Sequence, residues 1–188
     1  MGKKFKEYIK SDCLRMGNDY NILNVIKLFI RYKSFRYSVL MRAYKISKDE
    51  NKKIKVILIR LIKELLFFNT TIEIPLDVEV GKGLYMGHFS GITINRETIL
   101  GNNINIHKGV TIGQENRGKR MGAPTIGNKV WIGINSTIVG NILIGDNVLI
   151  APNSFVNFDV PSNSIVIGDK IKKCDNATEG YIGFEYTE

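Results

Sequence analysis

The first candidates for chemistry are the two histidines of the chain, His88 and His107. An imidazole with a pKa near 6.5 can take a proton from an alcohol at neutral pH, which is the work of a general base. A zinc centre with three histidine ligands needs one more histidine than a single chain carries. The two cysteines, Cys13 and Cys174, stand far apart without Cys-x-x-Cys spacing, so a disulfide framework is not expected. Proton transfer by one histidine needs no metal, but the residue types alone leave open whether His88 does this chemistry or is a polar corner residue.

A six-residue period surrounds the histidines and predicts the scaffold that positions them. Aliphatic side chains recur at this interval in three registers: Ile74, Val80, Met86 and Ile92; Ile94, Leu100, Ile106 and Ile112; and Ile126, Ile132, Ile138, Ile144, Ile150 and Val156. A helix repeats every 3.6 residues and a flat strand every 2, so neither explains the pattern. A solenoid explains it, with one short strand and one corner in each unit and three units in each triangular coil of 18 residues.

Two irregularities interrupt this period. The register shifts between Ile92 and Ile94, and a gap of 14 residues separates Ile112 from Ile126. We expect residues 114–125 in this gap to form an excursion loop, because binding groups are often placed on loops of rigid scaffolds. His107 directly follows an interior position, which favours a surface or inter-subunit role.

Residues 1–70 form a basic region of a different kind. They hold 17 Lys and Arg against 6 Asp and Glu, whereas the rest of the chain holds 10 against 12. The segments 21–29 and 54–68 have helical apolar spacing. We expect the stripe of the second helix to pack on the rest of the protein; it consists of Ile54, Leu58, Leu61, Ile62 and Leu65. Frequent charges disfavour a membrane crossing, binding to an anionic membrane surface stays open, and no nucleic-acid-binding motif is present.

Residues 73–168 resemble the hexapeptide-repeat acyltransferases, most closely the serine acetyltransferase branch and the polysaccharide O-acetyltransferases similar to it. The resemblance is carried by GKGLYMGHFSGITIN, by NINIHKGVTIG, by the run that starts PTIGNKVWIGINSTIVG, and by the upstream helical segment RYKSFRYSVLMRAYK. It implies a mainly β protein with a left-handed parallel β-helix over 71–168, a short α-helical region before it and a tail over 169–188. It also implies a homotrimer that uses acetyl-CoA and no metal.

The same resemblance assigns roles to individual residues. His88 stands at the position of the general base, and Glu73 stands at that of its carboxylate partner, which would fix the imidazole tautomer. Acetyl-CoA is expected in a groove between neighbouring solenoids. Its expected contacts are Gly113, Ile134, Asn135, Ala151, Pro152 and Lys172.

The acceptor side departs from serine acetyltransferases. Where that branch has an aspartate before the histidine and an Arg-His pair in the loop, this chain has Gly87, Gly122 and Ala123. Binding both charges of serine without counter-charges costs on the order of a few kcal/mol. We therefore expect a saccharide hydroxyl of a capsule or envelope polysaccharide as acceptor, beside Gly87, Ala123 and Arg120.

Two other functions stay open: serine O-acetylation in a rebuilt pocket, and a non-catalytic trimeric scaffold. The expected location is the cytoplasm, with peripheral association at the inner face of the membrane left open. No nucleic acid is expected as a partner.

Overall fold

The computed structural model describes residues 2–187, so Met1 and Glu188, the ends of the first and last expected segments, lie outside it. Four helices come first within this range: α1 Lys3–Arg15, α2 Ile22–Arg31, α3 Lys33–Asp49 and α4 Lys53–Phe67. The helices α2 and α4 confirm the two that apolar spacing predicts. α2 begins after Asn21, whose side chain accepts a hydrogen bond of 2.8 Å from the N–H of Asn24.

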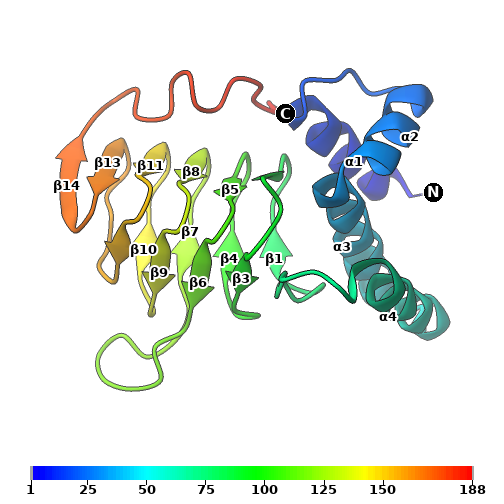
Figure 1. The fold of residues 1–188 in the computed structure, drawn as a ribbon, viewed down its shortest axis with the longest axis horizontal. Helices are drawn as coiled ribbons and strands as arrows, with labels where there is room; N and C mark the ends of the chain where they lie inside the picture. Colours follow the sequence, from blue (N-terminus) through cyan, green and yellow to red (C-terminus); the bar gives the residue numbers. More distant parts are fainter. Residues whose placement is uncertain (1, 188) are drawn as a thin grey trace.

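Fourteen short strands follow in the described range, and all but the last wind into a parallel β-helix, which confirms the expected fold class (Figure 1). They form three sheets. Sheet I holds β1 Glu79–Val80, β4 Ile99–Leu100, β7 Thr125–Ile126 and β10 Leu143–Ile144. Sheet II holds β2 Tyr85–Gly87, β5 Asn105–His107, β8 Val130–Ile132, β11 Val148–Ile150, β13 Ser164–Ile167 and β14 Lys170–Lys173. Sheet III holds β3 Thr93–Ile94, β6 Thr111–Gly113, β9 Thr137–Val139 and β12 Phe155–Val156.

The aliphatic side chains that recur every six residues form the core of the prism. Every aliphatic residue of the three registers is buried, with exposed fractions of 4% or less. Thr125 pairs with Leu143, 18 residues further on, as a triangular coil requires. Stacking like residues at the strand spacing buries them in continuous columns. The excursion loop also forms between β6 and β7, and it ends one residue earlier than expected because Thr125 belongs to β7.

The register shift lengthens one corner of the prism. Eight positions separate Met86 from Ile94 across this corner, whereas six separate Ile106 from Ile112 across the corner stacked on it. The longer turn carries His88, whose φ of 51° lies in the left-handed region that side chains other than glycine and asparagine seldom adopt. The irregularity in the repeat is therefore the feature that projects the imidazole from the scaffold.

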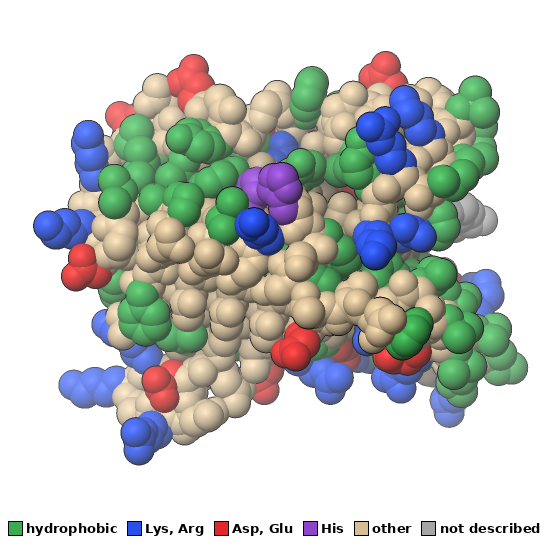
Figure 2. Space-filling view, viewed as in Figure 1, with side chains coloured by type: hydrophobic (Ala, Val, Ile, Leu, Met, Phe, Trp, Pro, Cys, Tyr) green, Lys and Arg blue, Asp and Glu red, His purple; other side chains and the backbone are tan. Residues whose placement is uncertain are grey.

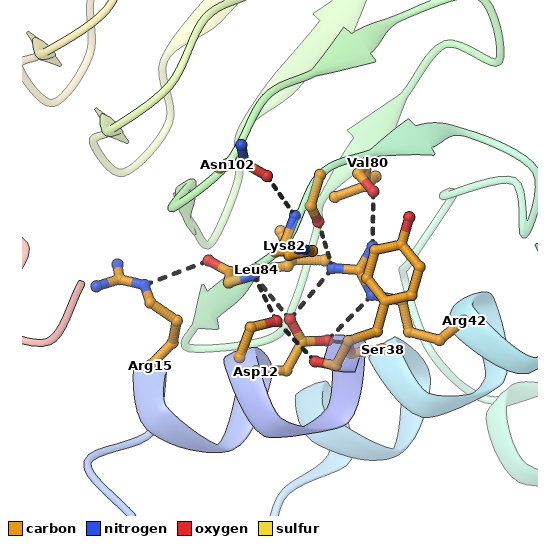
Figure 3. A network of polar contacts seen from close by, with 12 residues as sticks. Asp12, Arg15, Ser38, Arg42, Val80, Lys82, Leu84 and Asn102 are labelled. Atoms are coloured by element: carbon orange, nitrogen blue, oxygen red, sulfur yellow. Dashed lines mark hydrogen bonds and ion pairs between the residues drawn. The ribbon is translucent and has the colours of Figure 1, made fainter. Parts of the chain in front are cut away.

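A buried ion pair joins the helices to the first coil (Figure 3). The carboxylate of Asp12 in α1 lies 3.1 Å from Nε of Arg42 in α3, and both side chains are almost fully buried. Arg42 also donates to the carbonyl of Val80 at 2.7 Å, while Asp12 accepts from the N–H of Leu84 at 2.9 Å. Because each charge has several partners, the network fixes the orientation of α1 and α3 against the coil.

The expected packing of the α4 stripe is wrong for this chain. Its residues are exposed: Ile54 by 76%, Leu58 by 51%, Leu61 by 55%, Ile62 by 42% and Leu65 by 77%. α4 carries apolar residues on more than one side, and it turns Val56, Ile59 and Phe67 toward the core instead of the stripe. Within residues 2–187, no helix combines the length and apolar character that a membrane crossing requires.

The end of the chain returns along the β-helix. β14 pairs antiparallel with β13, so sheet II continues past the expected boundary at residue 168. Residues 174–187, here called the C-terminal strap, then run back across the coils to the helices (Figure 1). The strap is held by side chains of the corners and strands below it: Asn147 binds Thr178, Asn105 binds Tyr181, and Asn103 binds Tyr186.

Candidate functional site

His88 opens into a cavity between the β-helix and the helices. Its side chain is exposed, and the cavity of about 440 Å³ is bounded by Met16, Tyr32 and Ser34 on one side and by Tyr85 and the His88 corner on the other. Figure 2 shows histidine side chains at the surface where the coils meet the helical region, beside a band of apolar side chains. The imidazole is therefore open to a small molecule.

His107 lies next to His88 and forms part of the same surface. Their ring centroids are 6.4 Å apart, and His107 is also 4.8 Å from the ring of Trp131. Burial, and secondly the nearby His88, hold the pKa of His107 below its ordinary value of 6.5. Its Nε2 is buried and makes no hydrogen bond within the described part of the chain. His107 therefore combines a lowered pKa with one buried nitrogen that has no hydrogen-bond partner in the described residues.

Gly87 explains why His107 can sit there. The two residues are directly paired between β2 and β5, and a Cβ on Gly87 would lie 2.8 Å from Nδ1 and Cε1 of His107. Any side chain at position 87 meets the imidazole. The sequence analysis gave His107 no role in the site. Gly87, at the paired position of the neighbouring coil, was the signal that a large side chain could lie there.

Most of the expected coenzyme contacts share an edge of the prism with His88. This edge, where sheet II turns into sheet III, carries the stacked corners 88–91, 108–109, 133–136 and 151–154. Hydrogen bonds link successive corners: Gly109 donates to Ser90, Asn135 to Lys108 and Asn153 to Ile134. Four of the expected contacts, Ile134, Asn135, Ala151 and Pro152, therefore lie along the edge that carries His88.

Glu73 is placed apart from His88 in the single chain. It is exposed and lines a second cavity, of about 590 Å³, together with Lys63, Thr93 and Gly113. No hydrogen bond or ion pair joins Glu73 to His88 among residues 2–187. The carboxylate role of Glu73 stays a prediction.

The remaining expected site residues also lie away from His88 within one chain. Arg120 and Ala123 belong to the excursion loop, which leaves the edge between sheets III and I, and the Arg120 side chain is exposed. Lys172 is exposed in β14 at the end of sheet II. Their roles likewise stay predictions, and the part of the chain described here contains no group of three metal-ligating side chains.

Comparisons with known proteins agree with this architecture. Residues 123–157 match the model of the bacterial transferase hexapeptide family (six repeats). The serine acetyltransferase of Helicobacter pylori is 33% identical over 129 residues, which cover 69% of this chain and 75% of that protein. The chain belongs to the serine acetyltransferase family of hexapeptide-repeat transferases.

Other members of the family give the same result. The serine acetyltransferase of Staphylococcus xylosus is 40% identical over 125 residues, or 65% of this chain. A crystal structure of the Neisseria gonorrhoeae serine acetyltransferase in complex with serine has a TM-score of 0.72 at 28% identity and covers 91% of this chain and 69% of that one. This chain spans 57% of the Staphylococcus protein and 58% of a serine acetyltransferase structure from Entamoeba histolytica. These relatives are named for serine, so the resemblance to polysaccharide O-acetyltransferases stays a prediction.

Proposed function

We propose that this member of the serine acetyltransferase family moves an acetyl group from acetyl-CoA to a hydroxyl group, with His88 as the general base. Family membership supports the reaction class. The observation that carries the proposal is the exposed imidazole at a lengthened corner, on the same edge as four of the expected coenzyme contacts. In the described chain no metal-ligand cluster offers another way to activate the hydroxyl.

The chemistry requires one proton to be moved twice. The acceptor hydroxyl oxygen attacks the thioester carbonyl while His88 takes the hydroxyl proton, because an alcohol with a pKa far above 7 is otherwise a poor nucleophile. The tetrahedral intermediate then expels the coenzyme thiolate, which takes the proton back from the imidazolium. The products are the acetyl ester and free coenzyme A, and no oxidant or metal is consumed.

A second copy of the chain would complete this site. Gly113, Arg120 and Ala123 lie on or next to a different edge from His88, so only a neighbouring solenoid can bring such residues to the imidazole. A homotrimer supplies that neighbour at each of three equivalent edges. Glu73 would act in the assembled groove. Cytoplasmic location and peripheral membrane association stay predictions.

Serine is the acceptor that the relatives support. The family members compared above carry serine in their names, and this favours serine O-acetylation over the saccharide acceptor that the sequence analysis expects.

A neutral acceptor is a second candidate, because the side chains near His88 lack carboxylates. The cavity beside His88 is bounded by Arg31 and Lys33 and by no Asp or Glu, so the ammonium of serine finds no counter-charge there within one chain. Gly87 and Ala123 offer none either. This observation favours a saccharide hydroxyl.

The two acceptors are separated by measuring coenzyme A release. The full chain is incubated with acetyl-CoA and either serine or a panel of methyl glycosides, and the His88→Asn variant is the control. Release that depends on both an acceptor and His88 supports the proposal, and the better acceptor identifies the substrate class. Release that is unchanged by the substitution, or absent with every acceptor, refutes it.

A further inference from the structure

A second cleft continues from the His88 cavity along sheet II. It has a volume of about 370 Å³ and is lined mainly by aromatic rings: Tyr85, His107 and Trp131 from the strands, and Tyr181 and Phe184 from the C-terminal strap. Met16 and Tyr85 line both this cleft and the cavity of His88, so the two spaces adjoin. The strap therefore builds one wall of a hollow that leads to the general base.

The rings line the walls of the cleft and meet one another at steep angles. Trp131 lies 5.0 Å from Tyr181 in an edge-to-face contact and 4.8 Å from His107. Tyr181 stays 54% exposed and Phe184 stays 56% exposed. Aromatic side chains left this open present flat apolar faces to whatever enters the cleft.

The polar groups of the cleft are few and nearly all occupied. Arg15 and Asn105 are buried, and they bind each other as well as the strap backbone at Phe184 and Tyr181. Burial lowers the pKa of Arg15 to about 10. The exception is Nε2 of His107, which is buried without a partner within residues 2–187. Open aromatic faces with few unoccupied polar groups suit a ligand that is apolar on one face and carries its hydroxyl groups at the rim.

We propose that this aromatic cleft is the acceptor subsite and that it binds a sugar ring, with the Trp131 ring against the C–H face of the sugar and Tyr181 at its edge. Met16 and Tyr85 line both the cleft and the His88 cavity, so a sugar in the cleft would have its rim next to the space that His88 faces. No Asp or Glu lines the cleft to hold the ammonium of an amino acid. The inference rests on the proposed acetyl transfer and names the substrate class for it.

Trp131 gives a direct probe of occupancy because it is the only tryptophan in the chain. The full chain is titrated with methyl glycosides, covering neutral hexosides, N-acetylhexosaminides and hexuronides, and separately with serine, while tryptophan emission is recorded. We expect a saturable change with at least one glycoside that also serves as an acetyl acceptor, and no change with serine.

Kinetics of matched variants provide the second readout. Trp131→Ala should raise the acceptor KM about tenfold, the loss of one aromatic contact, while the KM for acetyl-CoA stays unchanged. Trp131→Phe keeps a ring and should restore most of the affinity. Tyr20→Ala removes a surface aromatic from the loop between α1 and α2, outside both cavities, and should change neither KM.

The outcomes separate this inference from the proposed function. No emission change with any glycoside, or an unchanged acceptor KM in Trp131→Ala, overturns the sugar subsite. If serine is acetylated in a His88-dependent reaction and no glycoside changes the Trp131 emission, the sugar subsite is overturned and the proposed acetyl transfer is retained. Loss of all acceptor-dependent coenzyme A release overturns the proposed function itself.

Discussion

Substitutions of Gly87 and His107 should have non-additive effects on the unfolding free energy, because the missing side chain of Gly87 leaves the space that the His107 ring fills. The perturbation is Gly87→Ala, alone and combined with His107→Ala. The new Cβ would lie 2.8 Å from two ring atoms of His107, and that ring is held in place by Trp131 at 4.8 Å. Overpacking of this kind costs about 1–3 kcal/mol of unfolding free energy.

The backbone contribution has the opposite sign and cancels in the comparison. The φ of Gly87 is not in the left-handed region, so alanine suits the strand and gains about 0.4–1 kcal/mol by restricting the unfolded chain. This gain is the same whether or not His107 is present. We therefore expect Gly87→Ala to destabilise the wild type by about 0.5–2 kcal/mol and to be neutral or stabilising in the His107→Ala background.

Urea denaturation at one protein concentration measures the four free energies of this cycle. Gly113→Ala is a matched control at the end of β6, where the nearest contact, with Val139, is 3.3 Å away. It should show no coupling to His107→Ala. Effects of Gly87→Ala and His107→Ala that add within about 0.5 kcal/mol would refute the packing on which the neutral acceptor site rests.

Two further predictions concern the helices and pH. Asp12→Asn leaves Arg42 buried without its charge partner, so it should lower the unfolding free energy by about 3–5 kcal/mol and Tm by roughly 6–20 °C in calorimetry. The control is Asp49→Asn in the exposed pair with Lys4, which should lower the unfolding free energy by less than about 1 kcal/mol. Equal effects of the two substitutions would contradict the role of the network. The pKa of His107 is lowered in the folded state, so below pH 6.5 the unfolded chain binds more protons than the folded one and stability falls as the pH drops from 6.5 toward that lowered value. His107→Gln should remove this part of the pH dependence, and a denaturation midpoint that changes with pH equally in both proteins would count against it.

The repeat made most of the fold predictable, because a buried column repeats its chemistry every coil. The spacing of 18 residues between Ile126 and Ile144 gives the length of one coil directly from the sequence. The C-terminal strap has no such period, since its position depends on side chains such as Asn147 that come from distant coils. Its course over sheet II could not be predicted for that reason.

The candidate site was predictable in part. The resemblance assigned His88, Ile134 and Pro152 to the site, and the register of the repeat places their corners on one edge. The aromatic cleft escaped prediction because it needs β2, β5, β8 and the strap together. The exposure of the α4 stripe escaped it too, because apolar residues on more than one side of α4 do not reveal which side faces its own chain.

The central claim is that His88 is the general base, and one kinetic comparison tests it most directly. The measurement is kcat/KM for acceptor-dependent coenzyme A release by the wild type and by His88→Asn, with acetyl-CoA affinity measured on both proteins and Lys108→Ala as the control on the same edge. The account predicts a fall of roughly two to four decades with unchanged acetyl-CoA affinity, and no such fall in the control. Activity of His88→Asn within about threefold of the wild type would contradict it.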